Sequence, residues 1–168
     1  GTLSFGTNLF NQTAGLTTLN GGNLTAAGTL TLAGGSLTGT GTVTATTVSN
    51  TGGQIGPGLS PGTLTITGNY TQGASGTLNI EVGGTTVGTQ YDRLAISGLA
   101  SLNGTLNASL INSFVPVSGN AFGVMTFGSR TGDFATKNVP GISGLAFQAT
   151  PNGTAYTLDV LPVAPSLL

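Results

Sequence analysis

One pentapeptide recurs six times in the 168 residues: a glycine, then Thr-Leu or Thr-Val, then a polar residue and an apolar one. The copies occupy residues 1–5, 28–32, 41–45, 62–66, 76–80 and 104–108. Side chains of a β-strand alternate between its two faces, so the third and fifth positions point to one side and the second and fourth to the other. Each copy therefore predicts a short strand with an apolar face and a hydroxyl- or amide-bearing face. The leading glycine suits a turn because it adopts positive φ without steric cost.

A longer echo accompanies the pentapeptide. Residues 21–32 align without a gap to residues 34–45, and a third double glycine begins at Gly52. Self-similarity of this kind is typical of arrays in which each unit buries its apolar face against the next. The spacing becomes irregular after residue 45, so no fixed coil length is predicted. Glycine recurs too often for a helix of more than two turns, and the abundant Thr, Val and Ile suit a pleated surface. The predicted fold class is all-β.

The chain divides in character near residue 85. Residues 1–85 are turn-dense and almost free of aromatic residues after Phe10, which predicts a β-solenoid-like part. Within it, residues 56–62 contain Pro57 and Pro61 and are interpreted as a rigid loop. Residues 86–168 hold five of the seven phenylalanines and six of the seven charged residues. Alternating segments at 93–97, 105–111, 121–127, 144–150 and 154–161 predict an antiparallel β-sandwich-like or capping part with an extended C-terminal arm.

Charge is unusually scarce. Only 4% of residues are Asp, Glu, Lys or Arg and the net charge is −1, against about 25% charged residues in an ordinary soluble domain. The chain therefore lacks the basic surface that nucleic acid requires. No apolar run approaches the roughly 18 residues of a membrane helix. Either Thr, Ser and Asn supply the solubility, or self-association is tolerated or intended, and we favour the second interpretation.

Residues able to perform catalysis are also scarce. The chain has no His and no Cys, which excludes Ser-His-Asp and Cys-His machinery and imidazole or thiolate metal sites. The carboxylates are scattered without evident pairing, at Glu81, Asp92, Asp133 and Asp159. We therefore predict no enzyme, no cofactor and no metal. The neighbours Asp92–Arg93 and Arg130–Asp133 are interpreted either as Arg–carboxylate pairs that fix register or as solvated turns.

The C-terminal segment, residues 158–168, is apolar and contains Pro162 and Pro165. Proline lacks a backbone donor, so the segment suits an edge strand or an extended arm. An arm that adds as a strand to the next subunit would make a head-to-tail contact that does not close and yields a filament. The alternative is a last strand folded back on its own domain. The candidate subunit-contact residues are Leu161, Val163, Leu167 and Leu168.

Several motifs carry a resemblance to a known group of proteins. They are residues 58–66 (Gly-Leu-Ser-Pro-Gly-Thr-Leu-Thr-Ile), 68–72 (Gly-Asn-Tyr-Thr-Gln), 91–94 (Tyr-Asp-Arg-Leu), 128–134 (Gly-Ser-Arg-Thr-Gly-Asp-Phe) and 158–160 (Leu-Asp-Val). Over about residues 50–160 the chain resembles the β-helical passenger regions of autotransporter-type adhesins and related secreted β-repeat proteins of bacteria. The resemblance implies export, a β-solenoid and a surface or adhesive role.

These observations lead to one functional expectation and one alternative. We expect a structural protein, extracellular or on the bacterial cell surface, whose partner is itself and which assembles into a surface or biofilm-matrix fibre. The alternative is a monomeric adhesin or passenger segment that binds glycans or host surfaces on its polar ladder. Surface aromatic residues would favour that alternative, and the tyrosines available are Tyr70, Tyr91 and Tyr156.

Overall fold

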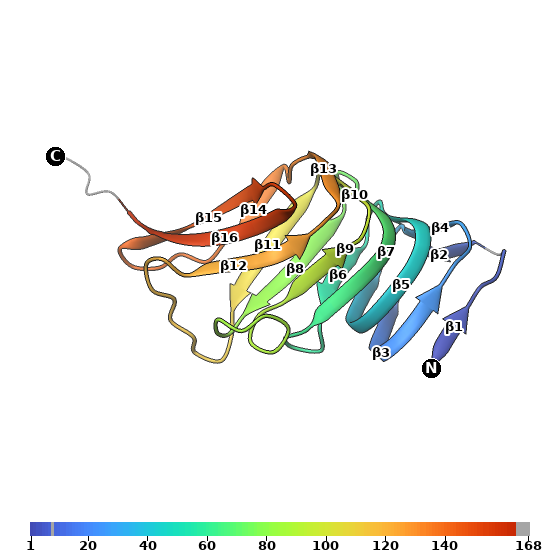
Figure 1. The fold of residues 1–168 in the computed structure, drawn as a ribbon, viewed down its shortest axis with the longest axis horizontal. Helices are drawn as coiled ribbons and strands as arrows, with labels where there is room; N and C mark the ends of the chain where they lie inside the picture. Colours follow the sequence, from blue (N-terminus) through green and yellow to red (C-terminus); the bar gives the residue numbers. More distant parts are fainter. Residues whose placement is uncertain (8, 164–168) are drawn as a thin grey trace.

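A computed structural model describes residues 1–7 and 9–163 of the chain. All secondary structure in these residues is β (Figure 1), which confirms the predicted fold class. The strands are β1 (Thr2–Ser4), β2 (Phe10–Gln12), β3 (Leu16–Thr25), β4 (Thr29–Leu32), β5 (Ser36–Asn50), β6 (Gln54–Pro57), β7 (Thr63–Gln72), β8 (Thr77–Val82), β9 (Arg93–Ile96), β10 (Leu99–Leu102), β11 (Thr105–Leu110), β12 (Ala121–Thr126), β13 (Ser129–Gly132), β14 (Thr136–Asn138), β15 (Leu145–Asn152) and β16 (Ala155–Pro162). The described residues contain no helix that could cross a membrane.

Most strands pair in parallel with a strand from the next pass of the chain. In one column Leu24 pairs with Val43, Val43 with Ile66, and Ile66 with Ile96. These steps span 19, 23 and 30 residues, so successive passes grow longer. The sequence echo of 13 residues is therefore not the structural repeat: Leu24 aligns with Leu37 in sequence but stacks on Val43. The echo relates strands on different sides of the molecule.

Strand β5 shows how one pass supplies three stacks. Its residues 36–38 pair with β3 and β6, residues 41–44 with β3 and β7, and residues 47–50 with β4 and β7. The first stack comprises the beginning of β3, the beginning of β5, β6, β8, β11 and β14. The second comprises β1, the end of β3, the middle of β5, the beginning of β7, β9 and β12. The third comprises β2, β4, the end of β5, the end of β7, β10 and β13.

The apolar positions of the pentapeptide form the core between these stacks. The third position is buried in the five later copies, as Leu30, Val43, Leu64, Leu78 and Leu106. Full burial of a Leu or Ile side chain contributes about 1.5–3 kcal/mol relative to exposure. The first copy differs, because β1 is the outermost strand of the second stack and Leu3 remains 57% exposed.

Glycine allows β5 to turn from one stack to the next. Gly39 has φ = +108° and Gly41 has φ = +134°, in the region that L-residues with a side chain rarely adopt. A Cβ atom at Gly39 would also overlap the carbonyl oxygen of Leu19 on the neighbouring strand. Both the conformation and the close approach of the two backbones therefore require glycine here.

Buried amides hold the bends at the third stack. The Gln72 Nε2 group donates hydrogen bonds to the carbonyl oxygens of Gly76, Asn103 and Thr105 at 3.1, 2.9 and 3.0 Å. The Tyr70 hydroxyl donates to Gln72 Oε1 at 2.7 Å. Gln72 thus links the bend that follows β7 to the bend that follows β10, through carbonyl oxygens that are buried or partly buried.

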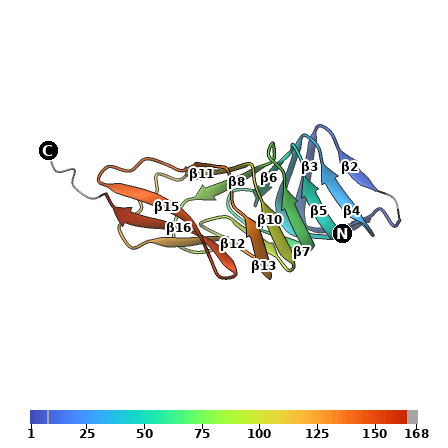
Figure 2. The ribbon, with the colours of Figure 1, turned by 90° about the horizontal axis from the view of Figure 1, so that it is seen from above.

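The C-terminal end of the core is covered by a hairpin. Strand β16 pairs antiparallel with β12 on one side and β15 on the other, and the hairpin lies at the end of the long axis away from β1 (Figure 2). Beneath it the Phe122 ring contacts Tyr91 at 5.4 Å between centroids, and Phe114 and Phe147 at 6.1 Å each. Such ring pairs add about 0.5–1.5 kcal/mol each beyond burial of their area.

Two features of the structure differ from the expectation: the direction of several strand pairs and the start of the loop at residues 56–62. Between the named strands, antiparallel pairing is confined to β12, β15 and β16, whereas β9, β10, β11, β13 and β14 continue the parallel stacks. An alternating sequence indicates a strand but not the direction of its partner. The segment interpreted as a rigid loop begins within a strand, because Gly56 and Pro57 belong to β6.

Candidate functional site

The N-terminal end of the stacks is open. Among the described strands, β1 pairs only with β3, β2 pairs only with β4, and residues 16–20 of β3 pair only with β5. Their outer edges present backbone N–H and C=O groups of the kind that accept a further strand. Strands β1, β2 and β3 themselves contain no charged residue.

Apolar side chains are exposed at the same end. Leu3, Leu9 and Leu16 are 57%, 76% and 67% exposed. Leu3 stands at the head of the buried column that continues through Leu24, but no further strand covers it among the described residues. A hollow of about 360 Å³ opens here between β1 and β3, with Leu3, Leu19 and Leu24 among its lining residues. The open end thus combines unpaired strand edges with an apolar hollow.

The predicted subunit-contact residues lie at the other end. Leu161 and Val163 are 42% and 55% exposed, as a contact surface requires. Val163 donates its backbone N–H to the Gly144 carbonyl at 3.0 Å. Leu167 and Leu168 lie outside the described residues. Within one copy the end of β16 does not approach β1, because the two lie at opposite ends of the long axis (Figure 1).

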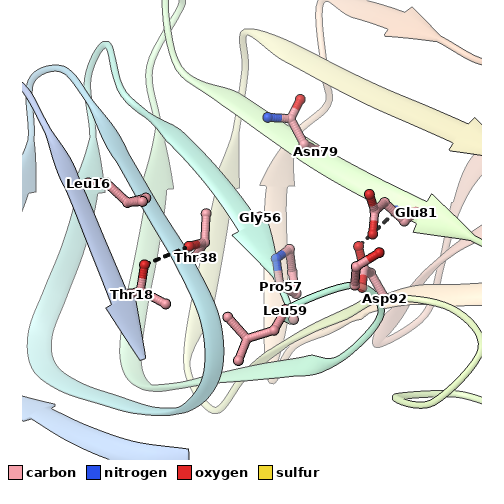
Figure 3. A pocket seen from close by; sticks show the side chains of 11 residues that line it. Leu16, Thr18, Thr38, Gly56, Pro57, Leu59, Asn79, Glu81 and Asp92 are labelled. Carbon is pink, nitrogen blue, oxygen red and sulfur yellow. Dashed lines mark hydrogen bonds between the residues drawn. The ribbon is translucent and has the colours of Figure 1, made fainter. Parts of the chain in front are cut away.

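A second surface feature is a notch in the first stack (Figure 3). The outward positions of this stack carry Thr18, then Thr38, then Gly56 on successive strands. Asn79 occupies the corresponding place on β8, because Ile55 pairs with Leu78. Gly56 has no side chain, so the row is interrupted there by a depression of about 410 Å³, which we call the notch. Its lining also includes Pro57, Leu59, Glu81 and Asp92.

Asp92 lines the notch and joins two segments of the backbone. It is 2% exposed. Its Oδ1 accepts a hydrogen bond from the Gly62 N–H and its Oδ2 from the Glu81 N–H, both at 2.8 Å. Burial raises the pKa of Asp92 to about 7, although the two backbone hydrogen bonds act in the opposite direction. Because both oxygens are engaged with the backbone, Asp92 joins the β6–β7 loop to β8.

Of the two interpretations of Asp92–Arg93 and Arg130–Asp133, the Arg–carboxylate pair is not found in the described residues. The Arg93 guanidinium donates to the Gly123 carbonyl at 2.8 Å rather than to its neighbour Asp92. Asp133 pairs with Lys137 at 2.6 Å, which is the ion pair found in the part of the chain that the structure describes. Sequence proximity suggested Arg130, but the strand turn brings Lys137 to the carboxylate instead. Both partners are about one third exposed, so this pair adds little stability.

Asp133 also accepts a hydrogen bond from the Tyr156 hydroxyl at 2.7 Å. Burial alone would raise the pKa of Asp133, but the hydrogen bonds from Lys137, Tyr156 and the Phe134 N–H outweigh it and hold the pKa below its usual value. No group of three or more acidic residues that could hold a metal occurs in residues 1–7 and 9–163.

A row of amides continues from the notch toward the C-terminal end. Asn79 Nδ2 donates to Gln54 Oε1 at 3.0 Å, Asn107 Nδ2 to Asn79 Oδ1 at 3.0 Å, and Asn138 Nδ2 to Asn107 Oδ1 at 2.7 Å. We call these four side chains the amide row. Its signal in the sequence is Asn at the fourth position of the pentapeptides at 76–80 and 104–108. The stacking that aligns them was not evident from the sequence.

The tyrosines do not provide a glycan platform. Tyr70, Tyr91 and Tyr156 are all buried. Their rings serve the core and the C-terminal cluster, and none is presented to a ligand at the surface.

No family model matches the chain, and no curated protein matches it. The resemblance to bacterial β-helical passenger regions therefore rests on the motifs quoted above and stays a prediction.

Proposed function

We propose that this protein is a structural, extracellular β-solenoid that assembles with copies of itself into a fibre at a bacterial surface or in a biofilm matrix. In this proposal the C-terminal segment of one copy adds as a strand to the open N-terminal end of the next. The protein works through backbone edges and apolar side chains and performs no catalysis.

The observation that carries the proposal is the difference between the two ends of the molecule. The β15–β16 hairpin and its aromatic cluster cover the C-terminal end, whereas the N-terminal end exposes the edges of β1 and β2 and an apolar hollow. Among the described residues no strand covers the edges of β1 and β2 or the exposed leucines beside them. Such a surface gains stability when another strand covers it.

The direction of assembly follows from where the two candidate surfaces lie. The acceptor is at the β1 end and the donor, which begins at Leu161 and Val163, is at the far end of the long axis (Figure 1). A contact between unlike surfaces at opposite ends does not close on itself, so it propagates as a filament. Strand addition would supply main-chain hydrogen bonds, and apolar donor residues would cover the hollow.

Electron microscopy and light scattering of the purified chain at micromolar concentration test the proposal. Filaments are expected for the unaltered chain. They should be lost in Leu3→Lys, which places a charge on the acceptor edge, and in a chain truncated after Val160, which removes the donor. Thr71→Lys adds the same charge at an outward position in the middle of the third stack, and should leave filaments intact. Monomers of the unaltered chain at all concentrations would refute self-assembly.

A further inference from the structure

We propose that the notch is a binding site for one unit of a neutral polysaccharide, whose chain continues along the amide row. The notch lies on the side of the first stack (Figure 3), and its lining includes Leu16 and Thr18 of β3, which also lie at the N-terminal end. The site is therefore tested separately from self-assembly.

The first argument is that the backbone does not require glycine at the notch. Gly56 lies outside the left-handed region, and a Cβ atom there would meet only Thr38 Cγ2, at an ordinary contact distance of 3.4 Å. Gly58, by contrast, has φ = +95° and no room for a Cβ atom beside the Gly62 backbone. Glycine inside a strand costs roughly 0.5–1 kcal/mol relative to alanine. A threonine at position 56 would complete the hydroxyl row, so the backbone conformation does not account for the gap.

The second argument is the mixture of groups around the gap. Pro57 and Leu59, the latter 53% exposed, supply apolar surface. The Thr38 hydroxyl and the Glu81 and Asn79 side chains supply hydrogen-bonding groups from the two flanking strands (Figure 3). Small-molecule sites typically combine apolar walls with a few convergent polar groups. A sugar ring matches this lining, because it has apolar C–H faces and a rim of hydroxyls that both donate and accept.

The third argument concerns the charge of the ligand. Two carboxylates, Glu81 and Asp92, line the notch. Backbone N–H groups bind both oxygens of Asp92 but not the side chain of Glu81. A carboxylate accepts hydrogen bonds from hydroxyls and repels an anion. The notch therefore favours a neutral sugar over an acidic one.

The amide row extends the site. Each amide has two N–H donors and two acceptor lone pairs, and bonding within the row engages one donor each on Asn79 and Asn107. A second donor and a second lone pair remain on each for a ligand. The row crosses the strands at the strand spacing of about 4.7–4.9 Å, so a polymer would lie along the long axis of the molecule. With no exposed tyrosine to stack on a sugar ring, affinity per unit is expected in the millimolar range, and a polymer would gain by multivalency.

Nuclear magnetic resonance of the isotope-labelled chain tests the site, with cellohexaose, maltohexaose, laminarihexaose and xylohexaose as probes at millimolar concentration. The Leu3→Lys variant serves as background, because Leu3 does not line the notch and the substitution is designed to prevent assembly. At least one probe should shift the Gly56 amide and the side-chain amides of Asn79 and Asn107. Gly56→Thr should fold with an equal or higher melting temperature and lose at least tenfold in affinity. Ser49→Thr, which adds one methyl to an outward position of the third stack, should bind as before.

Several outcomes would overturn the inference. One is the absence of shifts with all four probes. A second is unchanged binding by a folded Gly56→Thr variant. A third is shifts that follow protein concentration without sugar, which would identify a second copy as the occupant of the notch. Loss of filaments in Leu3→Lys bears only on self-assembly, so the failure of one proposal can be distinguished from the failure of the other.

Discussion

Replacing Gln72 by leucine should be among the most damaging single changes in this fold. The two side chains are similar in size, so the substitution removes hydrogen bonds while filling the same space. It leaves the buried Tyr70 hydroxyl without its acceptor and the Asn103 and Thr105 carbonyl oxygens without a side-chain donor. The Gly76 carbonyl is less affected, because it also accepts the Thr105 N–H at 3.0 Å.

The magnitude follows from the groups left unpaired. A buried polar group that loses its partner costs about 1–3 kcal/mol, and Tyr70 is fully buried. Adding partial losses at the two carbonyls, we expect Gln72→Leu to lower the free energy of unfolding by about 3–5 kcal/mol. At about 2–4 °C per kcal/mol for a chain of this size, the melting temperature should fall by roughly 6–20 °C.

Urea unfolding followed by circular dichroism, in the Leu3→Lys background that blocks assembly, measures this change. A double-mutant cycle with Tyr70→Phe separates the hydroxyl from the carbonyls. If the orphaned hydroxyl is a main cause, the double variant should be more stable than Gln72→Leu alone by about 1–3 kcal/mol. Gln54→Leu is the matched control on the exposed face and should change stability by less than about 1 kcal/mol. A loss below 1 kcal/mol in Gln72→Leu, or no rescue by Tyr70→Phe, would refute the reasoning.

Three further predictions concern other parts of the fold. Burial raises the pKa of Asp92 from 3.8 to about 7, so protonation of Asp92 favours the folded state: the contribution of Asp92 to the free energy of unfolding should be greatest below pH 4 and fall as the pH rises through 7. The fall is at most about 4 kcal/mol, and a pH titration of Asp92→Asn should lack it. Gly39→Ala should destabilise by at least about 2 kcal/mol, because its φ is positive and its Cβ would overlap the Leu19 carbonyl, whereas Gly56→Ala should be neutral or stabilising by thermal unfolding. Asn107→Leu should cost under about 1 kcal/mol in the same assay, since its amide bonds are partly solvent-exposed; a larger loss would show that the amide row is structural.

Strand positions were largely predictable because their signal is local. The expected segments 93–97, 105–111, 121–127, 144–150 and 154–161 coincide with β9, β11, β12, β15 and β16 to within two residues at each end. The inward positions of the pentapeptide were also correct wherever a neighbouring strand covers them, as at Leu64 and Leu78. Period-2 alternation fixes which side chains share a face, and it needs only adjacent residues to be read.

Stacking was not predictable because it depends on residues far apart in the chain. The 13-residue echo suggested that Leu24 and Leu37 are equivalent, yet loop length and the bends in β5 place Leu24 beside Val43. For the same reason the sequence could not reveal that the Asn79 and Asn107 side chains meet at 3.0 Å. Register is set by the number of residues in each pass, and here that number changes from pass to pass.

The donor residues were predicted from the sequence, whereas the acceptor end and the notch were not. Leu161 and Val163 were named from the sequence as subunit contacts; both are exposed, and their role in a contact stays a prediction. The acceptor end was not expected, because Leu3 sits in a pentapeptide whose pattern marks it as a core residue. Only the absence of a covering strand among the described residues makes it a surface. The notch was not foreseen, because Pro57 and Pro61 suggested a loop over residues 56–62, whereas the first two of these residues belong to strand β6.

The low charge of the chain has different consequences at the sides of the molecule and at its N-terminal end. Outward side chains along the stacks bond to one another, as Thr131 does to Ser101 at 3.2 Å and Asn138 to Asn107 at 2.7 Å. Such rows make the sides of the molecule polar without a net field. Many β-proteins protect exposed edges with charged residues, lysine above all, but the edge strands β1 and β2 carry none. The sides are therefore compatible with water while the end is left free to pair. Replacing Leu3 by lysine should abolish assembly and leave the fold unchanged. That result would show that the exposed edge drives assembly and that the core does not depend on it.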